Sequence, residues 1–352
     1  MNPIKPIKFL HVAYHIHQQL FQDGMMISGF YNWHRVFDTY AQMMLKEAGK
    51  GYSKFTYQPL TNVRENLEDY DVIFVGISKP ELEGCIISDI RSKLPKNTDT
   101  LVVACVDYAV EMWQGVFNPN NLKYQLDQAD FIFCAELAMV SHVKSLLPHR
   151  DIYHMMHPTD TDTLKKLCKP EETRRNALLS IIHRYDNNWL DMHLATKNFI
   201  GEIDTYGVML DGSLEVGILP YFEYVKRPET YGKFIDFLSE AKMCVDSYHR
   251  MHSYGRMGVE CACLKVPFVA PDTVTSAMMF WPDTTIRAGY TYDQEMMVRK
   301  LLKDDDFRKK VTDEAYKRVD MCNYQNSFFS FMKMIGKVEN QKFEFVDKRK
   351  KQ

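Results

Sequence analysis

The residues with the clearest chemical potential lie in one segment of the sequence, Ser247–Pro271. A loop ends there at Gly255, an apolar helix is predicted to begin at Arg256, and a single acid, Glu260, lies within that helix. A carboxylate in apolar surroundings is costly unless it has a partner. Glycine lets a ligand approach the backbone, and the free N–H groups at a helix start attract anions. We therefore expect a ligand with a phosphate beside hydroxyl groups, such as a sugar nucleotide.

Composition and charge narrow the class of protein. The chain has 352 residues, 45% of them hydrophobic and 26% charged, which predicts a globular protein with more than one core. Its formal net charge of −2 argues against a protein whose whole surface attracts nucleic acids, although it does not exclude a local basic groove. No apolar run approaches the roughly 20 residues of a membrane span, and no signal peptide is evident, so we expect a cytoplasmic protein.

The eight cysteines are scattered and form no CxxC pair. This pattern predicts reduced, mostly buried thiols and no zinc site, so no metal is expected in the functional site. The basic tail at residues 348–351 is interpreted as a solvated terminus.

Apolar runs of the buried parallel-strand kind alternate with helical patterns along both halves of the chain. In the first half, strands are predicted at 8–14, 71–77, 100–106, 129–134 and 152–156, and helices at 33–48, 82–94 and 136–147. In the second half, strands are predicted at 176–183, 206–211, 215–219, 243–246 and 266–270, and helices at 189–198, 229–241, 256–264, 293–302 and 306–319.

This alternation predicts an α/β protein with two doubly wound, Rossmann-like domains facing a cleft. The pattern changes at His157–Asp160, where we place the boundary. The expected division is an N-terminal Rossmann-like domain at 1–157, a second such domain at 158–335, and a tail at 336–352 that packs back on the first domain.

The segment around Glu260 resembles the donor half of GT-B glycosyltransferases of the large retaining type with an E-x7-E signature. In that family an aromatic-glycine pair precedes an acid by five residues, and a small-residue helix then leads to a Gly-x-Pro-Val-Val strand. Tyr254-Gly255, Glu260 and Val266–Val269 fall at this spacing. The resemblance covers roughly residues 129–328, including HPTD at His157–Asp160, which is similar to the family's interdomain NGVD.

Two departures from the family pattern lie in the segment around Glu260. His252 occupies the position of the first acid, which in the family faces the donor sugar. A histidine can also hydrogen-bond a sugar hydroxyl, and its presence indicates a different donor or an altered mechanism. The family's glycine after the small helix is replaced by Leu264-Lys265.

The resemblance implies roles for several residues. Glu260 would accept hydrogen bonds from the donor ribose, the alternative being a structural ion pair with a lysine or arginine. Arg184 would neutralise the donor diphosphate as charge develops on it. The family's accompanying lysine is replaced by Trp189, and Arg256 could supply the missing cation.

The remaining donor-side candidates are glycines, hydroxyl-bearing residues and one aromatic residue. They are Ser253, Gly255, Gly258, Thr275, Ser276, Ser28, Gly29 and Tyr231. The backbone N–H groups of Gly255 and Gly258 would face phosphate or sugar, and tight-turn roles are the alternative. Tyr231 would stack on the base or pack in the core.

Asp107 is the candidate of the first half, because it follows a predicted buried strand. It could orient or deprotonate an acceptor hydroxyl, or cap a helix N-terminus. The two roles are equally compatible with the sequence.

The predicted function is therefore transfer of a hexosyl or pentosyl group from a nucleoside diphosphate sugar, most readily a UDP-sugar, to an acceptor hydroxyl. The resemblance implies retention of configuration without a metal or other cofactor. No protein nucleophile is evident, and a donor phosphate oxygen can help to deprotonate the acceptor.

The acceptor is expected to be a carbohydrate or a lipid-linked glycan. An alternative is a phage-type enzyme that glycosylates a hydroxymethylated DNA base, which requires a basic cleft mouth and a flipped base. A sugar-nucleotide epimerase and a non-catalytic sugar-nucleotide-binding protein of the same fold are further alternatives.

Overall fold

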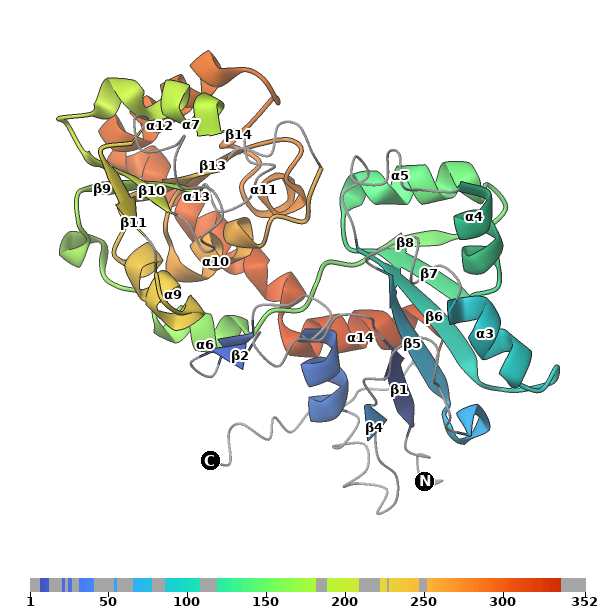
Figure 1. Ribbon diagram of the computed structural model, residues 1–352. Coiled ribbons are helices and arrows are strands. Elements are labelled where there is room, and N and C mark those ends of the chain that lie inside the picture. The colour runs from blue at the N-terminus through green and yellow to red at the C-terminus, as the bar shows by residue number, and fades with distance from the viewer. Residues whose placement is uncertain are drawn as a thin grey trace. The chain divides into compact units, whose positions relative to one another are not determined.

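The computed structural model describes residues 7–12, 21–22, 25–26, 32–40, 54–55, 66–77, 86–107, 119–181, 189–208, 222–226, 228–246 and 252–336. The chain forms two compact units (Figure 1). Unit 1 contains Met1–Leu20, Ser28–Thr159 and Cys322–Gln352, and unit 2 contains Phe21–Ile27 and Asp160–Met321. Each unit is an α/β sandwich on a parallel sheet, which confirms the predicted fold class.

The sheet of unit 1 has six parallel strands in the order β4-β1-β5-β6-β7-β8. The strands are β1 (Phe9–Val12), β4 (Lys54–Phe55), β5 (Val72–Ile77), β6 (Leu101–Val106), β7 (Phe131–Cys134) and β8 (Ile152–His154). The helices described in this unit are 32–40, α3 (Ile86–Lys93), α4 (Pro119–Asp127), α5 (Leu137–Leu146) and α14 (Tyr324–Met334), with a 3-10 turn η3 (Leu67–Asp69). The central strands are wholly apolar because helices cover both of their faces.

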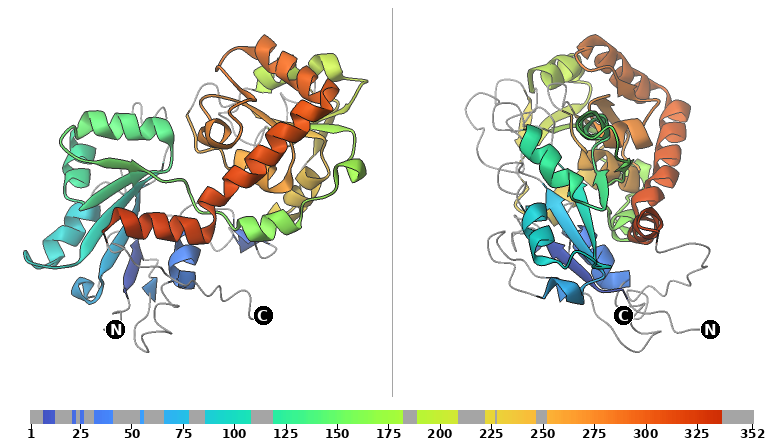
Figure 2. Two further views of the ribbon diagram at one scale, coloured as in Figure 1. Left: turned by 180° about the vertical axis from the view of Figure 1, so that it is seen from behind. Right: turned by 90° about the vertical axis from the view of Figure 1, so that its right-hand side faces the viewer.

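The two faces of this sheet bury different side chains. Alternate residues such as Ile73 and Val75 pack against α3, α4 and α5. On the opposite face, Phe74 and its neighbours pack against helix 32–40 and α14. Figure 2 shows α14 lying along the sheet of unit 1. The aromatic ring of Phe331 on α14 lies 5.0 Å from Phe37 and 5.7 Å from Trp33, so residues nearly 300 positions apart share one core.

Two histidines in this aromatic core give a testable pH dependence. Burial lowers the pKa of His11 to about 3 and that of His34 to about 4. Below the unfolded value of 6.5, the unfolded chain takes up protons that the folded chain does not, so stability falls as the pH drops from 6.5. The slope is about 1.4 kcal/mol per pH unit for each group. Urea unfolding at pH 7 and pH 5 should show that His11→Leu loses about 2 kcal/mol less than wild type on acidification. Identical losses in both proteins would contradict the prediction.

The sheet of unit 2 also has six parallel strands, in the order β11-β10-β9-β12-β13-β14. The strands are β9 (Ala177–Ile181), β10 (Asp204–Val208), β11 (Tyr224–Lys226), β12 (Met243–Val245), β13 (Phe268–Pro271) and β14 (Thr285–Ile286). A short antiparallel pair, β2 (Phe21–Gln22) and β3 (Met25–Met26), clusters with this unit.

The helices of unit 2 are arranged around α10. They are α6 (Thr161–Lys166), α7 (Trp189–Thr196), α9 (Tyr231–Ser239), α10 (Arg256–Leu264), α11 (Thr275–Phe280), α12 (Thr291–Lys303) and α13 (Asp305–Arg318), with 3-10 turns η5 (Glu171–Thr173), η6 (Lys197–Phe199) and η8 (Val319–Cys322). α10 contacts α6, α9, α11, α13 and β13, whereas α7 packs against α12. α10 is therefore the central helix of its layer, which explains its small side chains.

The observed elements differ from the expected ones in a few places. The helices α4, α6, α11 and α14 were not expected, and the candidate residues Thr275 and Ser276 lie at the start of α11. The edge strand described in unit 2 is β11, and the edge strand expected at 215–219 lies outside the described residues. Residues 322–335 pack with unit 1, whereas the sequence assigned them to the second domain. Most of the expected tail, 337–352, is not described.

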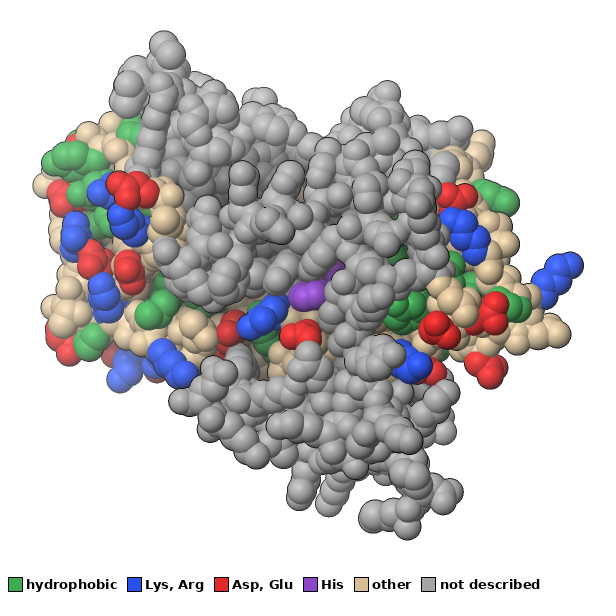
Figure 3. Space-filling view, turned by 60° about the horizontal axis from the view of Figure 1, so that its bottom comes forward, with side chains coloured by type: hydrophobic (Ala, Val, Ile, Leu, Met, Phe, Trp, Pro, Cys, Tyr) green, Lys and Arg blue, Asp and Glu red, His purple; other side chains and the backbone are tan. Residues whose placement is uncertain are grey.

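No helix in the described part of the chain is long and apolar enough to cross a membrane. On the face shown in Figure 3, Lys and Arg side chains alternate with Asp and Glu side chains among the described residues. That face therefore carries mixed charge where it is described.

Candidate functional site

The start of α10 is shaped by Gly255. This residue is the helix N-cap and has the left-handed backbone conformation, with φ 66° and ψ 67°. A Cβ at Gly255 would lie 2.1 Å from Cγ1 of Val274, so glycine is required both by conformation and by space. α10 ends at Lys265, which also has a positive φ, of 54°, at the position where the family has glycine.

The loop before α10 is fixed by the loop before α11. Ser253 forms a parallel bridge with Val274, and its N–H and C=O groups bond to Thr273 and Thr275 at 3.0 and 2.9 Å. The N–H of Ser276 donates to the carbonyl of Tyr254 at 3.0 Å. Two adjacent loops at the carboxyl ends of β12 and β13 thereby hold the helix start in place.

Glu260 lies inside α10 and is 2% exposed. The hydroxyl of Tyr231, the first residue of α9, donates a hydrogen bond to Oε1 of Glu260. Nε of Arg256, one turn earlier on α10, lies 2.9 Å from the same oxygen, and Nη2 of Arg256 donates to the Tyr231 hydroxyl at 2.8 Å. We call these three residues the Glu260 cluster. Its interactions occupy Oε1 and leave Oε2 without a partner among the described residues.

Burial and the neighbouring polar groups have opposite effects on the pKa of Glu260. Burial raises the pKa of Glu260, while the Arg256 guanidinium and the Tyr231 hydroxyl act to lower it. Burial also raises the pKa of Tyr231 well above its ordinary value, so its hydroxyl stays protonated and donates. For Glu260 the net effect is a raised pKa, and its second oxygen can accept hydrogen bonds from hydroxyl groups.

Tyr231 does not have the geometry expected of a base-stacking residue. Tyr231 is 5% exposed, and the Arg256 guanidinium lies 4.8 Å from the centroid of its ring. Because Arg256 covers the ring and the hydroxyl serves Glu260, Tyr231 is a buried support of the cluster. This corresponds to the core-packing alternative. Arg256 in turn contacts Glu260 and Tyr231, and its role as the diphosphate cation stays a prediction.

Gly258 and Ser276 are engaged in packing between α10 and α11. The N–H of Gly258 donates to the carbonyl of Gly255 at 3.1 Å, so it does not face a ligand as expected. A Cβ on Gly258 would meet the Ser276 hydroxyl at 2.3 Å. The Ser276 hydroxyl itself donates to the carbonyl of Gly255. These two residues, together with fully buried Thr275, therefore stabilise the packing of α10 against α11.

The other predicted donor-side residues are only partly covered by the described residues. His252 and Ser253 lie directly before the Gly255 turn, and the Ser253 hydroxyl is buried without a hydrogen-bond partner among the described residues. Arg184, Ser28 and Gly29 lie outside the described residues. A buried acid that the sequence did not single out, Asp246, follows β12 at the same edge of the sheet.

In unit 1, Asp107 directly follows β6, and its N–H donates to the carbonyl of Ile77 at the end of β5. Oδ2 of Asp107 lies 2.7 Å from Nε2 of His157, which follows β8. This pairing was not expected from the sequence, in which His157 marked only the domain link. The one available signal was a histidine just after a strand, at the edge of the sheet where Asp107 also lies.

The chain is similar to solved structures in its fold, although its sequence matches no known family. No protein-family model and no curated protein sequence matches the chain. An alpha-glucosyltransferase solved with UDP and DNA containing a HMU base is similar with a TM-score of 0.62 and 11% identity, over 94% of this chain and 99% of that one. The N-terminal domain of Candida albicans trehalose-6-phosphate phosphatase gives 0.70 and 8% over 94% and 97%. The trehalose-6-phosphate synthase OtsA gives 0.61 and 7% over 77% and 73%.

These neighbours share two parallel-sheet α/β domains with this chain. The chain has the GT-B fold. In open α/β sheets of this kind, ligands bind at the carboxyl ends of the strands. The Glu260 cluster lies at this end in unit 2, and Asp107 lies at the corresponding end in unit 1.

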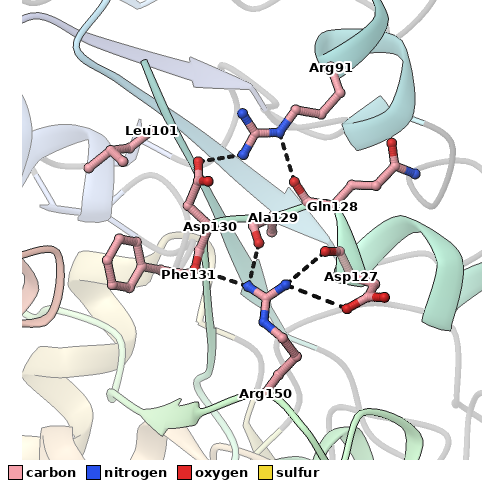
Figure 4. A pocket seen from close by; sticks show the side chains of 8 residues that line it. All are labelled: Arg91, Leu101, Asp127, Gln128, Ala129, Asp130, Phe131 and Arg150. Atoms are coloured by element: carbon pink, nitrogen blue, oxygen red, sulfur yellow. Dashed lines mark hydrogen bonds and ion pairs between the residues drawn. The ribbon is translucent and has the colours of Figure 1, made fainter. Parts of the chain in front are cut away.

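Three cavities that are lined by described residues lie at the amino ends of the strands of this GT-B fold. One of about 640 Å³ lies where β6 and β7 begin (Figure 4) and is lined by Arg91, Leu101, Asp127, Gln128, Ala129, Asp130, Phe131 and Arg150. Its arginines are occupied, since Arg91 pairs with Asp130, and Arg150 donates to the carbonyl oxygens of Asp127 and Ala129. We therefore interpret the charged residues around this cavity as a network that stabilises the fold, and not as a ligand site. Within the described ranges, no group of three or more His, Cys, Asp or Glu residues is placed to hold a metal ion.

Proposed function

We propose that this protein is a glycosyltransferase that moves a sugar from a UDP-sugar to an acceptor hydroxyl. The observation that carries the proposal is the buried carboxylate of Glu260, whose Oε1 is held by Tyr231 and Arg256. In this proposal its Oε2 accepts the hydrogen bonds of the donor ribose hydroxyls. The GT-B fold and the UDP-bound neighbours support the same donor class.

The donor side of the proposal assigns a role to each end of the nucleotide sugar. The positive end of the α10 helix dipole, at its first residue Arg256, attracts the diphosphate. In this proposal, Arg184 neutralises the charge that develops on the leaving phosphate. His252, in place of the first acid of the E-x7-E signature, hydrogen-bonds the donor sugar. We propose retention of configuration without a covalent enzyme intermediate.

The acceptor side is assigned to unit 1, where Asp107 orients and deprotonates the acceptor hydroxyl. The acceptor oxygen bonds to the anomeric carbon, and the bond from that carbon to the phosphate oxygen breaks with its electron pair leaving on UDP. The acceptor class that we propose is a carbohydrate or lipid-linked glycan hydroxyl.

The experiment that tests this function measures UDP release and sugar transfer with a panel of UDP-sugars. We expect one UDP-sugar to raise the thermal unfolding midpoint, because it binds only the folded state, and to be turned over when an acceptor is added. Donor alone should give at most slow hydrolysis. Conversion of the donor to an isomeric sugar nucleotide would indicate an epimerase, and tight binding without turnover on any acceptor would indicate a binding protein.

A second candidate is transfer to a hydroxymethylated base in DNA. It is favoured by one finding, that structures of an alpha-glucosyltransferase with DNA match this chain over 99% of their own length. The test is sugar transfer to a duplex containing hydroxymethyluracil, at 50 and 200 mM salt. DNA-dependent turnover that falls steeply with salt would support this acceptor, since phosphate contacts release counterions. Turnover confined to glycans would exclude it.

A further inference from the structure

Two carboxylates lie at the carboxyl ends of strands in unit 1, and they differ in their partners and in their exposure. Glu136, after β7, is 1% exposed, and both of its oxygens accept N–H groups of α5, from Ala138 at 2.6 Å and Met139 at 2.9 Å. Glu136 is therefore occupied as a helix cap. Asp107, after the neighbouring strand β6, has a side chain that is 28% exposed. Only Asp107 of this pair keeps access to solvent.

His157 restricts Asp107 from the buried side. Its own side chain is 4% exposed, and its Nε2 lies 2.7 Å from Oδ2 of Asp107. The two residues follow strands β6 and β8, which flank β7, so the sheet itself sets their separation. The backbone of Asp107 is fixed as well, through its N–H bond of 2.9 Å to Ile77. A carboxylate held at one oxygen from beneath presents its other oxygen in a defined direction.

A purely structural ion pair would show a different arrangement. Burying both members of such a pair costs more free energy than their attraction returns unless every polar atom is satisfied. Here the imidazole of His157 is buried, whereas the carboxylate of Asp107 is partly exposed. The buried His157 therefore orients an exposed group. The same division of roles is found where a buried group orients a reactive one.

We propose that His157 is a positioning residue whose Nε2, 2.7 Å from Oδ2, holds the carboxylate of Asp107 and thereby aims Oδ1 at the acceptor hydroxyl. This inference rests on the proposed function. In the transfer step, the acceptor oxygen bonds to the anomeric carbon, the carbon–phosphate-oxygen bond breaks toward UDP, and the hydroxyl proton passes to Oδ1. Asp107 later returns this proton to solvent.

The test compares His157→Met with His157→Gln, which match each other in size but differ in the N–H donor. His157→Met should lower kcat about ten- to hundredfold with an unchanged KM for the donor, because only the orientation of Asp107 is lost. His157→Gln should stay within about threefold of wild-type kcat. Thermal unfolding of both variants shows that each is folded.

A cycle with Asp107→Asn separates positioning from structure. Asp107→Asn alone should lower kcat by about 10²- to 10⁴-fold, and adding His157→Met should then lower it by less than about twofold further. An equal loss from His157→Met with and without Asp107, or no loss at all, would overturn the inference. If wild type transfers no sugar from any donor, the proposed function fails and this inference fails with it.

Discussion

Glu260→Gln is expected to weaken the binding of UDP by about ten- to hundredfold. Glutamine keeps the size of the side chain and one acceptor oxygen, but it removes the charge that strengthens hydrogen bonds from the ribose hydroxyls. A hydrogen bond to a charged group contributes about 1.5–3 kcal/mol, which corresponds to this range of affinity. Isothermal titration of UDP into both proteins measures the effect. The buried position of Glu260 excludes simple surface solvation as its role.

Glu240→Gln is the matched control for this prediction. Glu240 also lies in unit 2 and is ion-paired, with Lys169 at 2.7 Å and Arg175 at 2.8 Å. It lies at the end of α9, and the carbonyl of Glu240 bonds to the N–H of Arg175 just before β9 begins, which places it at the amino edge of the sheet. Its replacement should leave UDP affinity unchanged. Equal effects of the two replacements would show that lost charge or stability, and not ribose contact, weakened binding.

Gly255→Ala is expected to destabilise unit 2 by about 2–5 kcal/mol. A positive φ costs a non-glycine residue about 1–2 kcal/mol, and overpacking adds about 1–3 kcal/mol. Both terms apply, because φ is 66° and the new Cβ would lie 2.1 Å from Val274. A shift of the helix start would also displace Arg256, the first residue of α10, from its contact with Glu260. We therefore expect a thermal midpoint lower by several degrees, together with weaker UDP binding.

Gly289→Ala separates the two causes. Gly289 has φ 84°, and nothing lies within 4 Å of a Cβ built on it. This replacement should cost only the backbone term, about 1–2 kcal/mol, and leave UDP binding intact. If Gly255→Ala cost no more than Gly289→Ala, the close packing of the two loops at the start of α10 would be contradicted.

Local features were predictable from the sequence. The wholly apolar strands β5, β6 and β7 were predicted to within one or two residues, because burial on both faces leaves a continuous apolar run. The acid in α10 and the glycine before it were also visible, since both belong to one short segment. Lys265 was visible only as a missing glycine, and the structure shows that it takes the left-handed conformation itself.

Pairings between distant segments were not predictable. Tyr231 and Glu260 are 29 residues apart, and their contact depends on how α9 packs on α10. Without that contact, Tyr231 looked like a residue for stacking on a base. The pairing of Asp107 with His157 depends on strand order, which a single sequence does not specify. α14 was missed because its aromatic face, with Phe331 at its centre, has meaning only against the sheet of unit 1.

The most direct test of the central claim is titration of UDP and of 2′,3′-dideoxy-UDP into wild type and Glu260→Gln. Removing both ribose hydroxyls should weaken binding to wild type by about ten- to hundredfold, in line with lost hydrogen bonds to a charged acceptor. Because Glu260 is the proposed acceptor, the variant should bind the two ligands with similar affinity. A dideoxy penalty of the same size in both proteins would contradict the assignment of Glu260 to the donor ribose.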